Sequence, residues 1–427
     1  MVNIEKINDF LKNHTTPYIY NNVDFIRGET PIYYSGPYWG KEEISVAVDS
    51  FLNGKWISAG DKVYEFERKF SKKFNNNFSL MVNSGSSANL ILINGLKVYF
   101  KWKDNDEIIV SSVGFPTTIS VIYQNRLTPV FVDIEMSSLN FNIDEIEKKI
   151  TNRTRAIFVS PVLGNPPDMD RLVEIAEKHN LLLIGDNCDS LGSRWDGKLL
   201  NEYYTASTCS FYAAHHISTG EGGMVSTDIF RLHKTFNKLS WWGRECYCVG
   251  SENLLADGTC GNRFNKWLDG YDGILDHKYV FGEMGYNFKP LDLQGAIGTV
   301  QLDKFDEIER RRKNSKEKIT SIFLNKIPNL RAPISLDKAD PCWFGTSFIC
   351  EKKNLKNELV AHLEKNKIQT RNCFAGNILL HPGYKFLDDY KKYPEANKVL
   401  DSVFFIGAAP HYNDLVFDYI NEVVEKF

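Results

Sequence analysis

The sequence lacks the features that would place a protein in a membrane or on nucleic acid. No uninterrupted apolar run is long enough to span a bilayer, and the opening MVNIEKINDFLKNH is too polar to contain a signal-peptide core. A formal net charge of -3 over 427 residues gives no support for nucleic acid or an anionic membrane as a partner. We therefore expect a cytoplasmic protein, and 43% hydrophobic with 25% charged residues is ordinary for an enzyme in solution.

Lysine is missing from the stretch around which the chain is organised. Residues 205–224 read TASTCSFYAAHHISTGEGGM, and no lysine occurs between Leu199 and Lys234. A β-rich run leads through Ser210 to two histidines and a tight glycine-rich turn at residues 220–223. A strand that ends in serine next to such a turn is a usual phosphate-binding arrangement. The stretch offers no amine for covalent catalysis, but His215 is a base that works near neutral pH.

The hydrophobic pattern predicts an α/β fold. Between residues 78 and 227, short apolar runs alternate with helical stretches, which is typical of βαβ units around a sheet buried on both faces. Residues 244–283 interrupt this pattern with glycine, aspartate, asparagine, tryptophan and three cysteines. A segment of that length without regular structure indicates a function or an internal staple. The length of the chain predicts two domains.

The frame Ser210-Phe211-Tyr212-Ala213-Ala214-His215 resembles the fold-type I sugar aminotransferases, which use pyridoxal phosphate and act on nucleotide-linked keto-sugars. Members of that family carry Ser-Phe-x-x-x-Lys before a similar glycine-rich turn, and the lysine forms a Schiff base with the cofactor. The resemblance implies the type I fold of pyridoxal-phosphate-dependent transferases. It has an N-terminal arm (1–40), a large cofactor-binding domain with a mainly parallel central sheet (41–310, with the cysteine-bearing loop 244–283), and a smaller C-terminal α+β domain (311–427).

Histidine in place of that lysine implies a cofactor that is not covalently anchored. An imidazole cannot form a stable Schiff base, but it can take up a proton near neutral pH. We therefore expect pyridoxamine 5'-phosphate as the cofactor and His215 as the group that abstracts the proton. Tyr212, three residues earlier, is expected to assist.

Further motifs match cofactor-binding positions of the same family. The turn Asn83-Ser84-Gly85-Ser86-Ser87 precedes a helical stretch, where exposed amides suit a phosphate. An aspartate at the end of an apolar strand matches the acid that keeps the pyridine nitrogen protonated. In homodimers of this family, an asparagine reaches the cofactor phosphate of the neighbouring subunit, so the active site is shared. The resemblance implies these cofactor-binding residues: Gly85, Ser86, Phe115, Asp186, Asp189, Ser210 and Asn287.

Four of the eight cysteines form a candidate metal site. Cys188 follows the strand that ends at Asp186, and 57 residues separate it from Cys246. One residue separates Cys246 from Cys248, and eleven separate Cys248 from Cys260. Four thiolates can hold a [2Fe–2S] cluster or a zinc ion, although a one-residue gap is unusual for structural zinc. The alternative is four inert packed thiols.

The first two spacings resemble the iron–sulfur branch of the same family, whose last gap is shorter. That branch removes the 3-hydroxyl of CDP-4-dehydro-6-deoxy-D-glucose on the way to the 3,6-dideoxyhexoses of lipopolysaccharide O-antigen. The resemblance implies a [2Fe–2S] cluster on Cys188, Cys246, Cys248 and Cys260. It also implies a partner, a separate NAD(P)H-dependent iron–sulfur flavoprotein reductase.

The expected reaction is therefore the C-3 deoxygenation of a nucleotide-linked 4-keto-6-deoxyhexose. The resemblance places Phe344, Arg371 and Asn377 near the nucleotide-sugar. One alternative is a cluster-free, pyridoxamine-phosphate-dependent 3-dehydratase of a GDP- or dTDP-linked 4-keto-6-deoxysugar. Another is a catalytically inactive scaffold of the same fold, which has no reason to keep Asp186 and both phosphate turns. The missing lysine argues against an aminotransferase.

Overall fold

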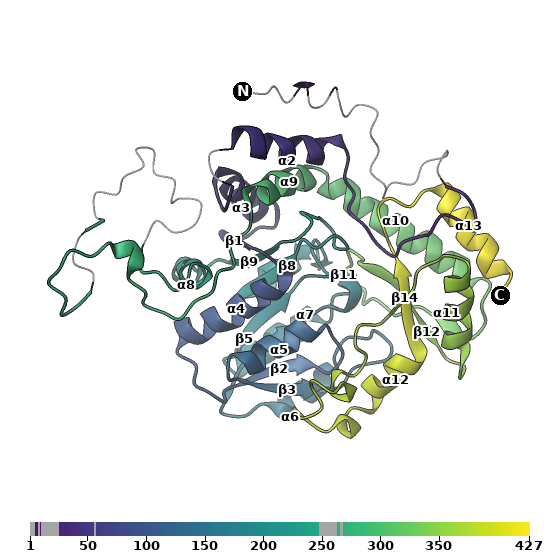
Figure 1. Ribbon diagram of the computed structural model, residues 1–427. Coiled ribbons are helices and arrows are strands. Elements are labelled where there is room, and N and C mark those ends of the chain that lie inside the picture. Colours follow the sequence, from purple (N-terminus) through teal and green to yellow (C-terminus); the bar gives the residue numbers. More distant parts are fainter. Residues whose placement is uncertain (1–4, 7–8, 10–24, 55–56, 247–262, 265–267) are drawn as a thin grey trace.

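Figure 1 shows the computed structural model of the chain. It describes every residue except 1–4, 7–8, 10–24, 55–56, 247–262 and 265–267. Much of the predicted arm, and Cys248 and Cys260 of the predicted cluster loop, therefore lie outside the described residues. In the part of the chain that is described, no helix has the length and apolar character needed to cross a membrane.

A seven-stranded sheet forms the centre of the larger part of the molecule. Its order is β1-β9-β8-β5-β4-β2-β3, and neighbouring strands are parallel except where β9 pairs with β1 and β8. The mainly parallel sheet predicted from the sequence is confirmed. The strands are β1 (Phe78–Val82), β2 (Glu107–Ser111), β3 (Thr128–Val132), β4 (Thr154–Val159), β5 (Leu182–Asp186), β8 (Ala206–Ser210) and β9 (Gly223–Thr227).

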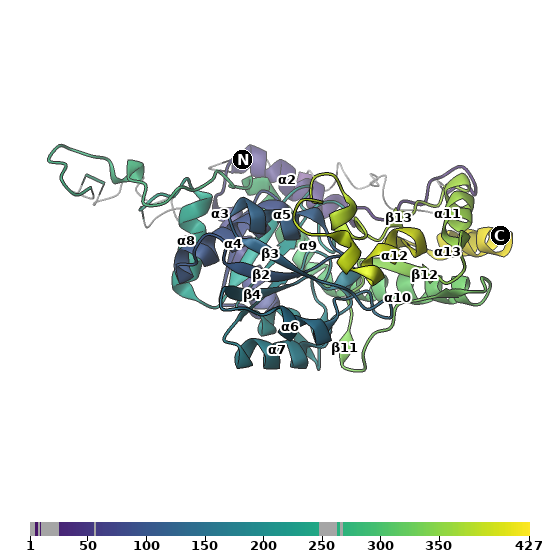
Figure 2. The same ribbon diagram turned by 90° about the horizontal axis from the view of Figure 1, so that it is seen from below.

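Helices cover both faces of this sheet, so its central strands are buried on both sides. Figure 2 shows α4 and α5 on one side of β2, β3 and β4, and α6 and α7 on the other. Every residue of β2, β8 and β9 is buried. The covering helices are α4 (Gly85–Phe100), α5 (Pro116–Gln124), α6 (Ile146–Lys149), α7 (Met169–Lys178) and α8 (Phe230–Ser240).

A layer of three helices lies beside β1: α2 (Lys41–Asn53), α3 (Asp61–Lys73) and α9 (Asp292–Asp303) (Figure 1). The N-cap of α3 is Gly60, which has no side chain to receive the first amides of the helix. Asp292 takes over this role from α9. Its Oδ1 accepts hydrogen bonds from the amides of Gly60 (3.0 Å), Lys62 (2.9 Å) and Val63 (3.0 Å). The N-termini of the two helices are thereby linked.

The C-terminal part contains a second, antiparallel sheet in the order β10-β12-β14-β13. Its elements are α10 (Phe305–Leu324), β10 (Leu330–Arg331), β12 (Gly345–Cys350), α11 (Leu355–Lys365), β13 (Arg371–Asn372), α12 (Pro394–Ser402), β14 (Val403–Gly407) and α13 (Asp414–Glu425). A small third sheet joins β6 (Arg194–Trp195), β7 (Lys198–Leu199) and β11 (Ala339–Asp340).

One apolar cluster spans the seven-stranded sheet and the C-terminal four-stranded sheet. The largest buried cluster joins Ile119 and Phe158 of the first part to Phe344 and Phe405 of the second. The domain boundary predicted between residues 310 and 311 falls inside helix α10. The division of the chain into domains stays a prediction. The junction between the parts is tightly packed, and the candidate site lies against it.

Candidate active site

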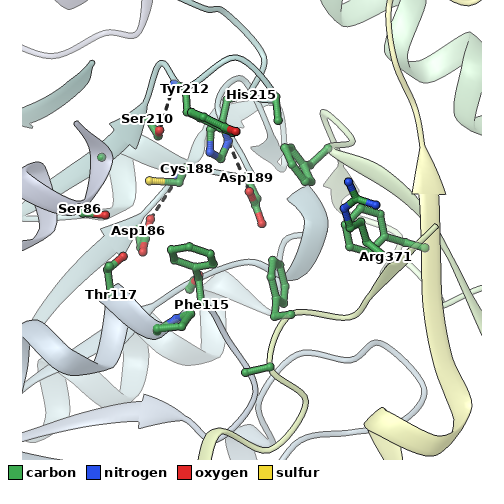
Figure 3. A pocket seen from close by; sticks show the side chains of 18 of the residues that line it. Ser86, Phe115, Thr117, Asp186, Cys188, Asp189, Ser210, Tyr212, His215 and Arg371 are labelled. Atoms are coloured by element: carbon green, nitrogen blue, oxygen red, sulfur yellow. Dashed lines mark hydrogen bonds and ion pairs between the residues drawn. The ribbon is translucent and has the colours of Figure 1, made fainter. Parts of the chain in front are cut away.

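A cavity of 560 Å³ lies where the parallel strands end. Its wall takes residues from the turns that follow β1, β2, β4, β5 and β8, because the carboxyl ends of parallel strands meet at one edge of the sheet. Figure 3 shows these side chains converging on the cavity. The structure brings eleven of the predicted site residues to this wall: Gly85, Ser86, Phe115, Asp186, Cys188, Asp189, Ser210, Tyr212, His215, Phe344 and Arg371.

The turn after β1 forms a cradle suited to an anion. Ser84 is the N-cap of α4, and its side chain accepts from the Ser87 amide at 3.1 Å. A Cβ on Gly85 would lie 2.5 Å from the Cβ of Ser210, so only glycine fits there. The Ser210 Oγ accepts from the Tyr212 amide at 3.2 Å, which leaves its hydroxyl proton for an acceptor in the cavity. The helix start and this hydroxyl together fit a phosphate group.

Asp186 ends β5 and is held in place by three donors. Its Oδ2 accepts from the Asn89 side chain at 2.8 Å and from the Thr118 hydroxyl at 2.7 Å. Its Oδ1 accepts from the amide of Cys188 at 3.2 Å. The carboxyl group is buried, with 4% of the residue exposed, so these bonds fix its direction toward the cavity. Such a carboxylate can pair with a protonated ring nitrogen.

Phe115 is the N-cap of α5, and 54% of its surface is exposed. An exposed aromatic ring at a cavity mouth is a ready surface for a planar ligand. Thr117, in the first turn of the same helix, also lines the cavity. Figure 3 places Phe115 across the cavity from His215.

His215 lies in the loop between β8 and β9, next to Asp189. The Nδ1 of His215 is 3.5 Å from the Oδ1 of Asp189, which is longer than a good hydrogen bond. Burial, reinforced by the positive charge of Arg312, lowers the pKa of His215 to about 4. Burial, with a further contribution from Asp186, raises the pKa of Asp189 to about 8. At neutral pH the imidazole is therefore unprotonated, and the neighbouring carboxyl carries its proton.

The remaining wall comes from residues that the sequence did not single out. Tyr34, from the predicted arm, lines the cavity together with Phe374, Ala375 and Phe405. The guanidinium carbon of Arg371 lies 4.2 Å from the centre of the Tyr34 ring, which orients this cation at the cavity edge. The richness of the arm in tyrosine was the one signal that could have indicated a binding surface there.

Two residues predicted to bind the cofactor or the substrate lie away from the cavity. Asn377 is fully buried and bonds the Asn397 side chain at 2.7 Å and the Leu379 amide at 3.0 Å, so it shapes the fold behind the wall. Asn287 is exposed and accepts a hydrogen bond from the Lys289 ammonium group. The predicted reach of Asn287 into a neighbouring subunit stays a prediction.

The predicted metal ligands are described only in part. Cys188 lines the cavity, whereas Cys246 packs in an apolar cluster with Phe211 and Trp241. Among the residues that the structure describes, no group of three or more His, Cys, Asp or Glu side chains is placed to hold a metal ion. Burial, reinforced by the charge of Asp186, raises the pKa of the Cys188 thiol. The described residues therefore do not assemble the cluster site.

The sequence profile of the DegT/DnrJ/EryC1/StrS aminotransferase family matches residues 39–427. The chain belongs to this family. Among its DegT/DnrJ/EryC1/StrS relatives, the dTDP-4-dehydro-2,6-dideoxy-D-glucose 3-dehydratase of Saccharopolyspora spinosa is 36% identical over 414 residues, 94% of this chain and 88% of that protein. The lipopolysaccharide biosynthesis protein RfbH of Salmonella typhimurium is 34% identical and covers 94% of this chain and 93% of its own.

A solved structure of the same fold is the Escherichia coli GDP-4-keto-6-deoxy-D-mannose-3-dehydratase with bound hydrated PLP. It superposes with a TM-score of 0.80 and 28% identity, covering 93% of this chain and 100% of that chain. The predicted type I transferase fold is thereby confirmed. Both dehydratases among these relatives are named for the 3-dehydration of nucleotide-linked keto-deoxysugars.

Proposed function

We propose that the chain removes the 3-hydroxyl of a nucleotide-linked 4-keto-6-deoxyhexose by dehydration, with pyridoxamine 5'-phosphate as cofactor, and that it is not an aminotransferase. One observation carries the proposal. None of the described residues that line the cavity is a lysine, and His215 stands where sugar aminotransferases carry theirs. Two relatives named as 3-dehydratases of such sugars support the substrate class.

The cavity fits the proposed cofactor. The amides of Gly85 and Ser86 and the Ser210 hydroxyl would hold the phosphate, and Asp186 would pair with the ring nitrogen. Phe115 offers an aromatic face for the ring. When bound, pyridoxamine phosphate supplies an amine for the sugar ketone and a ring that withdraws electrons. The residues present thus provide a partner for each end of the cofactor.

His215 would act as the base. Its lowered pKa of about 4 keeps the imidazole unprotonated at neutral pH, which is the form that can take a proton. Asp189, whose Oδ1 lies 3.5 Å from Nδ1, would hold the orientation of the ring. Tyr212 and the ring of Phe344, whose centre lies 5.1 Å from that of His215, flank the base.

Replacing His215 with asparagine tests the proposal. We expect His215→Asn to lower the dehydration rate by about 10²–10⁴-fold while cofactor binding persists, because only the base is removed. His179→Asn is the matched control, since His179 lies at the surface and pairs with Glu147 at 2.9 Å. Dehydration is measured as loss of the 4-keto-6-deoxy substrate with CDP-, GDP- and dTDP-linked sugars. Unchanged turnover in His215→Asn, or formation of an amino-sugar product by the wild type, would overturn the proposal.

A reductive version of the reaction is the second candidate, favoured by the spacing of Cys188, Cys246, Cys248 and Cys260 and by the place of Cys188 at the cavity. It would use a CDP-linked sugar, a [2Fe–2S] cluster and an NAD(P)H-dependent flavoprotein reductase. An anaerobic visible spectrum with iron and sulfide analysis of the same wild-type preparation separates the two candidates. About two irons and two sulfides per chain support the cluster. A colourless, iron-free protein after anaerobic reconstitution leaves the cluster-free dehydratase.

We include a homodimer with a shared site in this proposal. Its support is the exposed position of Asn287 outside the cavity of its own chain.

Arg371 at the cavity edge, stacked on Tyr34, would meet the charged diphosphate of the nucleotide-linked substrate.

A further inference from the structure

Arg312 lies behind the cavity wall that carries His215. It is on α10 and is fully buried, with 0% of its surface exposed. Its Nη1 donates to the carbonyl oxygens of Trp343 (3.4 Å) and Phe344 (3.2 Å). Its Nη2 donates to those of Ala214 (3.3 Å) and His215 (2.9 Å). One guanidinium group thus holds the main chain of two separate segments.

The two segments belong to different parts of the molecule. Residues 214–215 follow β8 of the large sheet, and residues 343–344 precede β12 of the small one. The rings of His215 and Phe344, one from each segment, face each other with centres 5.1 Å apart. A second link joins the same segments, since the His216 Nε2 lies 2.8 Å from the Cys342 carbonyl oxygen. Arg312 therefore sets the separation of two cavity residues without reaching the cavity itself.

Burying this guanidinium group costs free energy of folding. A buried cation loses its hydration, and here main-chain dipoles replace it rather than a carboxylate. Burial lowers the pKa of Arg312 to about 10, so the side chain stays charged at neutral pH. Its neighbours in the run of three arginines behave differently, because Arg310 is exposed and Arg311 pairs with Glu307 at 2.7 Å.

We propose that Arg312 is a positioning residue for the reaction, holding the His215 loop against the Phe344 segment so that the imidazole keeps its place in the cavity wall. The role in this reaction rests on the proposed function. The contact itself, a clamp formed by Arg312 between the two segments, rests on the four hydrogen bonds alone. Lysine keeps the charge but lacks the planar fork, and cannot bond both segments at once. Loss of the fork should displace His215, and a displacement of about 1 Å can cost 10²-fold in rate.

The test compares Arg312→Lys with Arg310→Lys, its matched control on the exposed face of the same helix. Both are studied in the cofactor-bound protein. For Arg312→Lys we expect kcat to fall by about 10- to 100-fold with little change in KM or in cofactor affinity. Hydrogen–deuterium exchange should rise selectively in peptides covering 211–219 and 341–345. Arg310→Lys should match the wild type in every readout.

A milder variant keeps the test decisive if Arg312→Lys does not fold. The Ser35 hydroxyl donates to the Ala214 carbonyl at 2.5 Å, the same oxygen that Arg312 contacts. Ser35→Ala should raise exchange in 211–219 with a smaller fall in kcat. Unchanged exchange in both peptides, or a uniform rise across the sheet with kcat per folded molecule preserved, would overturn the proposal. If the wild type performs no dehydration, the proposed function fails, and the exchange data still decide whether the clamp exists.

Discussion

At the scale of single residues, the cavity depends on side chains that do not line it. Thr118 is 1% exposed, yet its hydroxyl donates to the Asp186 Oδ2 at 2.7 Å. The Asn89 amide group donates to the same oxygen. The Thr208 hydroxyl in turn donates to the Oδ1 of Asn89 at 2.5 Å and so orients this side chain. The direction of the carboxylate is thus determined by a chain of buried hydrogen bonds.

We predict that Thr118→Val weakens binding of the cofactor about ten-fold, because a buried hydrogen bond to a charged group is worth about 1.5–3 kcal/mol. The change keeps the shape of the side chain and removes only its hydroxyl group. Cofactor affinity is measured by titration of the absorbance of the bound cofactor. Thr118→Ser, which restores the donor, should bind as the wild type does. Equal affinity in Thr118→Val would show that Asn89 alone suffices to hold Asp186.

At the scale of elements, the contact between α9 and α3 carries more than packing. The Oδ1 of Asp292 receives three amides at the start of α3, which its own N-cap, Gly60, leaves without a side-chain acceptor. We predict that Asp292→Ala lowers the free energy of unfolding by about 1–2 kcal/mol, the range of a lost cap. Denaturant titration provides the measurement. Asp292→Asn retains an acceptor oxygen and should lose less, so equal losses in both variants would contradict the capping role.

The sequence predicted the elements whose pattern is local. Strands β2, β4 and β5 were visible as continuous apolar runs because both faces of the sheet are covered. The cavity turns were visible because each follows such a strand. The burial of Arg312 could not be predicted, because EIERRRKNS has the composition of a solvent-exposed helix face. Only the structure shows that Ile308 and Ile319 on the same helix are buried. The position of Asn377 was not visible either, because burial depends on segments far away in sequence.

At the scale of the whole molecule, several histidines are buried in the unprotonated form. Burial lowers the pKa of His215 and His233 to about 4 and of His411 to about 3, and it also lowers the pKa of His216. In the unfolded chain these groups take up protons as the pH falls through about 6.5. The folded protein does not, so acid favours unfolding.

We therefore predict that stability falls as the pH drops from about 6.5 toward 4, by up to about 1.4 kcal/mol per pH unit for each histidine. Asp189 opposes this, because its raised pKa of about 8 lets the folded state bind a proton that the unfolded chain releases above pH 4. Four histidines outweigh one carboxyl group. Urea titrations at pH 5 and pH 7 test the balance, and equal midpoints would contradict it.

The loop between β8 and β9 begins and ends on residues that pair across the sheet, Ser210 and Gly223. Both ends of the loop are therefore anchored by the scaffold, whatever side chain occupies position 215. A gene lineage that exchanges the reactive group at this position inherits the phosphate cradle, the acid and the sheet unaltered. In such a family, a point substitution at the reactive position can change the chemistry while the protein still folds.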